Sequence, residues 1–128
     1  MKNVMVVDDN PVHAKMAAKV VTKADPNAEV RTYTDPFLAM SDALENAPDL
    51  IVLDFMMPRI DGVQLLRELR KQGIKTKAVI VSGFTRKVSE RILPENNVAD
   101  IVEKPYSTQE FISKMEKILG EQPTCAES

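Results

Sequence analysis

DLIVLDFMMPRIDG, residues 49–62, is the most informative stretch of this 128-residue chain. Within it the apolar run 51–53 leads to the carboxylate of Asp54, and the turn-forming residues Pro58 and Gly62 follow. An apolar run of this length between turn signals indicates a buried strand. The last residue of such a strand lies at the carboxyl edge of the sheet, where open α/β sheets bind ligands. Asp54 is therefore the first candidate for a functional residue.

A second acidic site has the same context. Asp8 and Asp9 directly follow another apolar run, residues 4–7. Asp54 alone could be a turn residue, since Asp often caps the turn after a strand. Two carboxylate sites at the ends of two buried strands, however, repel one another and are costly to desolvate. The pair of sites therefore indicates a cation held between them.

The composition indicates one ordinary domain. The chain is 44% hydrophobic and carries a net charge of -2, and no linker or repeat divides it. Lys and Arg are spread along the sequence and form no basic stripe with interleaved aromatics, which argues against nucleic-acid binding as the main task. We expect residues 1–120 to form the domain and residues 121–128 to be a disordered polar tail.

Cysteine usage and hydropathy indicate a cellular location. The single cysteine, Cys125, has no partner within the chain, which fits a reducing, intracellular setting. The apolar run that follows Lys2 is too short for a signal-peptide core, and no stretch approaches the length of a membrane span. We expect a soluble, cytoplasmic protein that does not contact a membrane.

Cap-plus-proline pairs begin the first two predicted helices, at Asn10-Pro11 and Asp35-Pro36. The first helix carries apolar residues at helical spacing, namely Val12, Met16, Ala17, Val20, Val21 and Ala24. The second has the apolar stripe Phe37, Met40, Ala43, Leu44 and Ala47. We expect both stripes to face the core. His13 falls on the polar side of the first helix, and we assign it no chemistry.

The remaining elements alternate strand and helix. We predict an edge strand at residues 29–33, strands at 50–54 and 78–81, and a fifth strand containing 101–102. The third helix places Val63, Leu66 and Leu69 inward and ends near Gly73. The fourth, at about residues 86–93, is short and weakly patterned. A capping box at Ser107 and Glu110 begins the last helix, whose apolar face is Phe111, Ile112, Met115, Ile118 and Leu119.

Five strand-helix repeats predict an α/β fold: a parallel sheet covered on both faces by right-handed crossovers. Polar groups then converge at one edge, at Asp8-Asp9, Asp54, Ser82 and Lys104. Three carboxylates form the oxygen-rich site that Mg²⁺ prefers. A lysine and a hydroxyl opposite the metal could hold phosphoryl oxygens. These groups suffice for a carboxylate nucleophile to attack a phosphorylated donor.

With these residues the chain resembles the receiver domain of two-component response regulators, from Met1 to about Gly120. Four segments carry the resemblance in family order and spacing: VMVVDDNP at 4–11, IVLDFMMPRIDG at 51–62, VIVSG at 79–83 and VEKPY at 102–106. The resemblance implies a doubly wound (βα)5, flavodoxin-like sandwich with a five-stranded parallel sheet in the order 2-1-3-4-5.

The resemblance also implies roles for the acidic residues. Asp54 is expected to accept the phosphoryl group and to bind Mg²⁺, with Mn²⁺ as a substitute. Asp9 should bind the metal directly and Asp8 largely through water, and the backbone carbonyl of Phe55 should supply a further ligand. Lys104 should bridge to the phosphoryl group.

Partners follow from the same resemblance. The donor would be a phosphohistidine on a sensor histidine kinase or histidine phosphotransfer protein, and small phosphodonors could serve in vitro. Ser82 would be the switch hydroxyl that moves toward the phosphoryl group. The downstream protein target would dock on the surface formed by the fourth helix, fifth strand and fifth helix. The domain is thus expected to be no enzyme beyond promoting its own phosphotransfer and slow dephosphorylation.

Three residues depart from the family pattern. Ile101 stands where the family usually has Tyr or Phe, and a β-branched side chain has few rotamers. We therefore expect signalling through backbone shifts around residues 82–93 more than through an aromatic flip. Met56 and Phe84 are apolar at positions that border the path of the attacking water, so neither can orient it by hydrogen bonding. We expect slow self-dephosphorylation, while the small Gly83 leaves the approach to Asp54 open.

Other functions fit the sequence less well. A phosphatase of the haloacid-dehalogenase type needs a second Asp two residues after the first, and position 10 is Asn. No Gly-rich phosphate loop follows any predicted strand. A receiver-like interaction module that works without phosphorylation remains the alternative, because fold alone does not establish activity. The chain could be a stand-alone receiver, which Met1 favours, or one domain of a longer protein.

Overall fold

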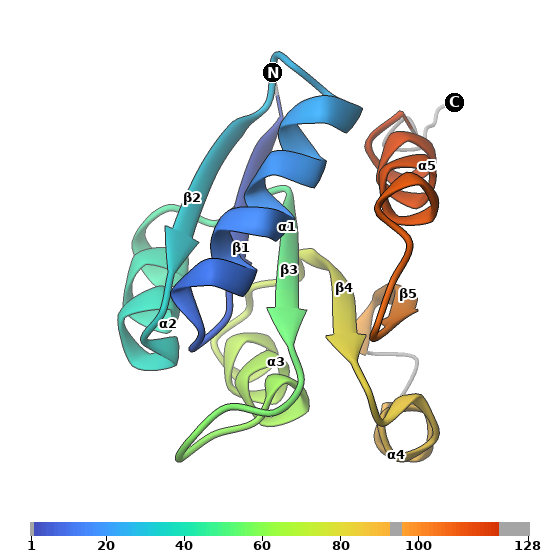
Figure 1. The fold of residues 1–128 in the computed structure, drawn as a ribbon. Helices are drawn as coiled ribbons and strands as arrows, with labels where there is room; N and C mark the ends of the chain where they lie inside the picture. Colours follow the sequence, from blue (N-terminus) through green and yellow to red (C-terminus); the bar gives the residue numbers. More distant parts are fainter. Residues whose placement is uncertain (1, 93–95, 121–128) are drawn as a thin grey trace, which may run out of the picture.

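The computed structural model describes residues 2–92 and 96–120, and within them strands and helices alternate along the chain (Figure 1). The elements are β1 (Asn3–Val7), α1 (Pro11–Ala24), β2 (Glu29–Tyr33), α2 (Pro36–Glu45), β3 (Leu50–Asp54), α3 (Gly62–Lys71), β4 (Lys77–Ser82), α4 (Thr85–Arg91), β5 (Val98–Glu103) and α5 (Thr108–Leu119). All strand pairs are parallel, and the sheet order is β2-β1-β3-β4-β5. The predicted fold class and strand order are confirmed.

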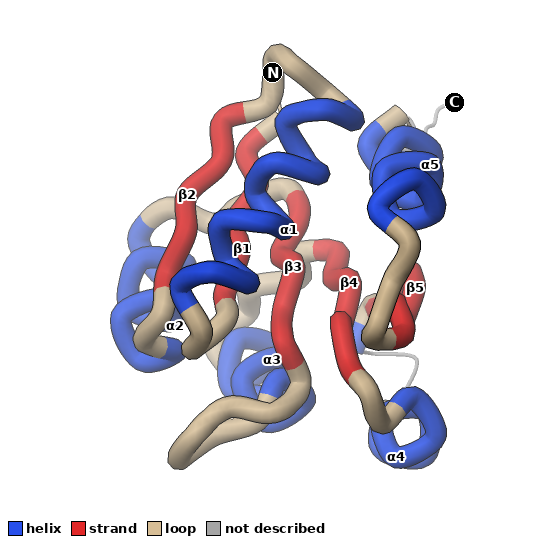
Figure 2. Tube along the Cα trace, viewed as in Figure 1, coloured by secondary structure: helices blue, strands red, loops and turns tan. Residues whose placement is uncertain are grey.

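Helices lie on both sides of the sheet (Figure 2). Alternate residues of the central strands supply two separate cores, one on each face of the sheet. Val4, Val6 and Val52 belong to the core under α1 and α5. Met5, Val7 and Leu53 belong to the core under α2, α3 and α4. Every residue of β3 is buried, as expected for a strand covered on both sides. The sheet edge that carries Asp54 is therefore held between two packed layers.

The predicted helix ends are largely confirmed. Asn10 and Asp35 cap α1 and α2 with their side chains, each followed by proline at the first helical position. After α3, Gly73 has φ +85°, its N–H bonds to the carbonyl of Arg70, and the N–H of Ile74 bonds to that of Leu69. This pair of bonds is the Schellman arrangement that favours glycine.

Two helices are rotated from their predicted orientation. Val12 and Met16 are 63% and 44% exposed, whereas α1 buries Ala14, Ala17, Val20 and Val21. On α2, Phe37 and Leu44 are 42% and 44% exposed, and the buried residues are Pro36, Ala39 and Ala43. Ala47 is exposed beyond the end of α2. The predicted stripes are thus confirmed at Ala17, Val20, Val21 and Ala43 and wrong at the exposed positions. Small side chains at the contact let each helix lie close to the sheet, which turns the bulkier apolar residues outward.

Smaller differences concern the fourth and fifth helices. At Ser107 only one of the two capping-box bonds is present among the described residues: its hydroxyl accepts from the N–H of Glu110 at 3.3 Å. The predicted fourth helix extended to Leu93, which lies outside the described residues, as do Cys125 and the whole predicted tail, 121–128. Among the described helices none is long and apolar enough to span a membrane.

Candidate functional site

The three acidic residues converge at the carboxyl edge of the sheet. The parallel register pairs Val7 with Leu53, so Asp8 after β1 lies beside Asp54 at the end of β3. Asp8, Asp9 and Asp54 each contribute one carboxylate oxygen, and these three oxygens lie within 4.8 Å of one another. Asp8 is 6% and Asp54 9% exposed, while Asp9 is open to solvent. The arrangement is a half-buried carboxylate cluster that is accessible from one side.

Backbone hydrogen bonds fix the segment that follows Asp54. The N–H of Phe55 bonds to the carbonyl of Val81 on β4 at 3.0 Å, which extends the sheet by one residue. The carbonyl of Phe55 then accepts from the N–H of Gly62 at 2.9 Å, closing the loop onto the start of α3. A Cβ atom at Gly62 would lie 2.8 Å from the carbonyl oxygen of Asp54. The glycine therefore lets the helix begin against the backbone of the acidic site.

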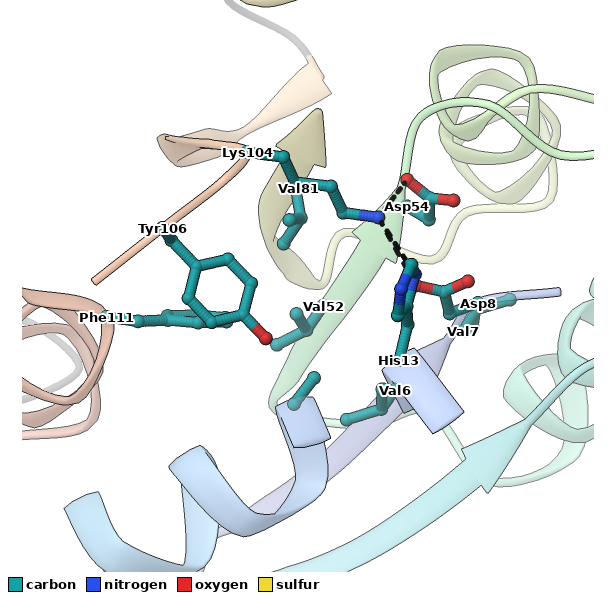
Figure 3. Close-up of a pocket in the computed structure, with 11 residues that line it drawn as sticks. Val6, Val7, Asp8, His13, Val52, Asp54, Val81, Lys104, Tyr106 and Phe111 are labelled. Atoms are coloured by element: carbon teal, nitrogen blue, oxygen red, sulfur yellow. Dashed lines mark hydrogen bonds and ion pairs between the residues drawn. The ribbon is translucent and has the colours of Figure 1, made fainter. Parts of the chain in front are cut away.

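Lys104 is the cation of the site (Figure 3). Its backbone N–H bonds to the carbonyl of Ser82 at 2.9 Å, which carries the lysine from β5 over the carboxylates. Its Nζ lies 3.3 Å from Oδ1 of Asp54 and 3.8 Å from Oδ2 of Asp8. Its side chain is 26% exposed. The ammonium therefore bridges two of the three carboxylates.

One lysine does not compensate the buried charge. Burial is the largest effect on both Asp8 and Asp54, and it raises the pKa of each carboxyl above its ordinary value. The charge of Asp8 raises the pKa of Asp54 further, while Lys104 acts in the opposite direction on both. A divalent cation would relieve this repulsion, and an all-oxygen donor set suits Mg²⁺. The cluster of Asp8, Asp9 and Asp54 could hold such an ion, and the carbonyl of Phe55 as a further ligand stays a prediction.

Ser82 ends β4 at the same edge, and its hydroxyl oxygen accepts a hydrogen bond from the turn that follows. The side chain is 1% exposed, and its Oγ accepts a hydrogen bond of 2.8 Å from the N–H of Phe84. Phe84 is the N-cap residue of α4 and caps the helix with no side-chain hydrogen bond. In this conformation the Ser82 hydroxyl therefore stabilises the turn into α4.

The other predicted residues lie around the site in different environments. Met56 and Phe84, in the turns after β3 and β4, are 56% and 50% exposed. Ile101 in β5 is partly buried and packs against the core under α2, α3 and α4. None of these three side chains contributes a polar group to the site. Their predicted roles depend on a phosphorylated state and stay predictions.

Two residues of the cavity were not predicted. His13 is exposed, as expected, but its Nδ1 lies 3.5 Å from Nζ of Lys104, and it lines the same cavity as Asp8 and Asp54 (Figure 3). Tyr106 also lines the cavity, and burial followed by the charge of Asp8 raises the pKa of its hydroxyl. The sequence feature that could have identified His13 is its position in the first turn of a helix that begins directly after the acidic pair.

Contacts of Arg91 join the acidic loop to α4. The Arg91 guanidinium forms an ion pair with Asp61, the N-cap of α3, and lies 5.6 Å from the ring centre of Phe55. The carbonyl of Arg91 accepts from Arg67 at 3.1 Å. In α4 itself Val88 is the buried residue. This short helix is thus held largely by contacts of its last residue.

Replacing Arg91 with alanine should release α4. We expect a loss of about 1 kcal/mol in the free energy of unfolding, because a half-buried ion pair and a cation-aromatic contact disappear together. Amide hydrogen exchange in α4 should become faster than in the wild type. The matched control is Arg86→Ala, whose guanidinium is 92% exposed and lies 3.8 Å from Glu90. Equal rates of amide hydrogen exchange in α4 of the two variants would contradict this role of Arg91.

Comparisons with known proteins agree with the fold. Residues 4–116 match the family model for the response regulator receiver domain. The chain is 36% identical over 104 residues to protein-glutamate methylesterase/protein-glutamine glutaminase 1 of Anaeromyxobacter dehalogenans, which covers 80% of this chain and 29% of that protein. It is 26% identical over 114 residues to the probable C4-dicarboxylate response regulator DctR of Bacillus subtilis, covering 89% and 50%. The chain therefore spans half or less of the length of these relatives.

Solved structures give the same result over nearly complete chains. The receiver domain of Francisella response regulator 1452 is 32% identical with a TM-score of 0.74, covering 94% of this chain and 98% of that one. The receiver domain of NtrX from Brucella abortus is 28% identical with a TM-score of 0.77, covering 93% and 99%. Family model, sequence relatives and solved structures agree, and this chain belongs to the response regulator receiver domain family of two-component systems.

Proposed function

We propose that Asp54 accepts a phosphoryl group from a phosphohistidine in a Mg²⁺-dependent reaction, and that the modified domain changes its binding to a partner. The observation that carries the proposal is the position of the Lys104 ammonium, 3.3 Å from Asp54 and 3.8 Å from Asp8 within a cluster of three carboxylates. Phosphoryl transfer requires mainly positioning and charge neutralisation, and this cluster offers a nucleophile with both.

The acidic cluster would hold the metal through Asp8, Asp9, Asp54 and the carbonyl of Phe55. When bound, Mg²⁺ supplies charge neutralisation for the carboxylates and for the oxygens of the transferred group. In the transfer a carboxylate oxygen of Asp54 forms a bond to phosphorus while the N–P bond of the donor breaks. The donor imidazole leaves with that electron pair. Lys104 then exchanges its contact with Asp54 for the phosphoryl oxygens, where a fixed positive charge stabilises the developing negative charge.

The hydroxyl of Ser82 links this chemistry to α4. Its oxygen accepts from the N–H of Phe84, which leaves the hydroxyl hydrogen available to donate to a phosphoryl oxygen. Because Phe84 is the N-cap of α4, a movement of the Ser82 hydroxyl toward the phosphoryl group would pull on the start of that helix. Ile101 cannot sweep a large volume, so we infer that the signal passes through the β4-α4 backbone rather than through its side chain.

Exposed apolar side chains suit the partners of this reaction. Val12, Met16, Met56 and Phe84 belong to α1 and to the turns after β3 and β4, and all are at least 44% exposed. Burying such side chains would hold a helix of a histidine kinase or phosphotransfer protein against the acidic site. A groove of about 380 Å³, lined by residues of α4, β5 and α5 that include Ser89, Ile101 and Lys114, is available to a downstream protein.

The proposal is tested by intact-mass analysis after incubation with acetyl phosphate, with and without Mg²⁺. We expect a single phosphoryl adduct on the wild type in Mg²⁺, and none on Asp54→Ala or in the presence of EDTA. Absence of an adduct with acetyl phosphate and with a phosphohistidine protein, under conditions in which Mg²⁺ binds, would contradict the proposal. It would favour an interaction module that works without phosphorylation.

The phosphorylated form should decay slowly, because neither Met56 nor Phe84 can orient the attacking water. Replacing Met56 with asparagine should accelerate the decay about fivefold, the effect of one hydrogen bond of about 1 kcal/mol in the transition state. The measurement is the loss of the phosphoryl adduct by mass analysis after removal of the donor. Met56→Leu is the control and should leave the rate unchanged. A fast wild-type decay that Met56→Asn does not increase would refute this account.

A further inference from the structure

Helix α2 carries more apolar surface than the core uses. Its buried residues are Pro36, Ala39 and Ala43, whereas the larger Phe37 and Leu44 are 42% and 44% exposed. An exposed apolar side chain by itself is common, but several on one side of a helix indicate a surface that another molecule covers. The sequence pattern of α2 is thus explained only in part by the fold of this domain.

Helices α2 and α3 lie side by side (Figure 1) and pack against each other. Of the exposed apolar side chains of α2, Phe37 lines a groove between these two helices. Its volume is about 620 Å³, and its lining residues are Phe37, Met40, Arg59, Ile60, Gln64, Arg67, Glu68 and Lys71. Three of them are apolar, three are cationic and one is acidic. The groove therefore combines an apolar part with a net positive charge.

Arg59 has an unusual backbone conformation at the end of this groove. Its φ is +72°, a region that L-residues other than Asn and Asp rarely adopt. Glycine would take this conformation without strain, so the arginine indicates a use for its side chain. The guanidinium lies 4.8 Å from the ring centre of Phe37 and 3.5 Å from Asp35. It therefore joins the apolar and the cationic parts of the groove.

Two cations of the groove, Arg59 and Lys71, have ion-pair partners that can be exchanged. Arg59 and Asp35 are 63% and 40% exposed, and Lys71 pairs with Glu68 at 3.2 Å with 70% and 42% exposure. Ion pairs this exposed contribute little to stability. Carboxylates of an incoming molecule could replace them at small cost.

We propose that the α2-α3 groove binds an acidic amphipathic helix of a partner protein. A groove between two helices accepts a rod, and a third helix can present apolar residues on one side to Phe37, Met40 and Ile60. Acidic residues flanking that side meet Arg59, Arg67 and Lys71. A planar anionic membrane matches the charge but cannot enter the concave surface. Binding here does not require phosphorylation of Asp54, so this proposal and the proposed function can fail independently.

The test is an NMR titration of the ¹⁵N-labelled full chain with a designed helical peptide of about 15 residues. The probe has Leu and Phe along one side and Glu at the flanking positions, and in the control peptide every Glu is replaced by Lys. We expect saturable shifts of amide signals in α2 and α3 with a dissociation constant below about 1 mM. The lysine peptide should bind at least fivefold more weakly.

Two matched pairs of variants locate the site. Phe37→Ser should weaken binding of the acidic peptide at least fivefold, while Leu38→Ser, at the next and 60% exposed position, should not. Lys71→Glu should weaken it similarly, while Lys15→Glu makes the same charge change on the exposed side of α1 and should not. Arg59→Gly removes the side chain and relieves the backbone strain. It should keep the thermal midpoint at or above that of the wild type and still weaken binding.

Four results would overturn the proposal. The first is equal binding of the acidic and lysine peptides. The second is a set of shifts confined to other elements, such as α4 and α5. The third is saturable binding to phosphatidylserine vesicles together with no binding of the acidic peptide, which would identify a membrane surface as the occupant. Equal effects of Phe37→Ser and Leu38→Ser would also contradict the assigned groove.

Discussion

Replacing Gly62 with alanine should destabilise the domain by about 2 kcal/mol and slow its phosphorylation at least about tenfold. The added Cβ would lie 2.8 Å from the carbonyl oxygen of Asp54 and 3.3 Å from the Cα of Phe55, both backbone atoms that cannot turn aside. Either α3 or the acidic loop must shift. Because the carbonyl of Phe55 accepts from the N–H of Gly62, the shift also displaces an expected metal ligand.

Chemical denaturation and the rate of adduct formation from acetyl phosphate measure the two effects. Gly83→Ala is the matched control, because the nearest atom to its added Cβ is the carbonyl oxygen of Lys104 at 4.0 Å. That variant should lie within about 0.5 kcal/mol of the wild type. If Gly62→Ala matches the stability of Gly83→Ala and the phosphorylation rate of the wild type, the close contact does not shape the site.

Replacing Asp54 with asparagine should have the opposite effect on stability. In the metal-free protein at pH 7.5 we expect a gain of about 1–2 kcal/mol, because one charge is removed from a cluster that is 6–9% exposed at Asp8 and Asp54. Mg²⁺ should raise the thermal midpoint of the wild type and have a much smaller effect on Asp54→Asn. Glu116→Gln, an exposed charge removal on α5, is the control and should change stability by a few tenths of a kcal/mol.

The gain from Asp54→Asn should depend on pH in a defined direction. The pKa values of Asp8 and Asp54 are raised in the folded state, above the ordinary value of 3.8. The stability that protonated carboxyls confer is fully present below that value and is lost as the pH rises through the folded-state pKa. The difference between variant and wild type should therefore shrink as the pH falls from 7.5 toward 4. A difference that grows on acidification would contradict the raised pKa of Asp54.

The sequence predicted the architecture well because its signals were local. The buried run 51–53, the caps at Asn10 and Asp35 that proline follows, and the glycine after α3 each determine a short segment. Five strands that alternate with five helices leave few possible topologies. The convergence of Asp8, Asp54 and Lys104 then followed from parallel pairing alone.

Helix orientation was predicted less well because it depends on packing partners. Periodicity placed Met16 and Phe37 inward, but both are exposed, and the buried faces of α1 and α2 include Ala14 and Ala39. His13 was missed because its contact with Lys104 joins residues 91 positions apart. The hydrogen bond from the N–H of Phe84 to the Ser82 hydroxyl was not predictable either, because a serine hydroxyl can accept from several nearby donors. Contacts of this kind become visible only in three dimensions.

The central claim is that Asp54 carries the phosphoryl group, and reductive trapping tests it most directly. The protein would be incubated with acetyl phosphate and Mg²⁺ and treated with borohydride, which reduces an aspartyl phosphate to homoserine, and then digested and sequenced by mass spectrometry. We expect homoserine at position 54, with none when Mg²⁺ is chelated. Homoserine at Asp8 or Asp9, or a phosphoryl adduct that persists in Asp54→Ala at the wild-type level, would contradict the assignment of Asp54.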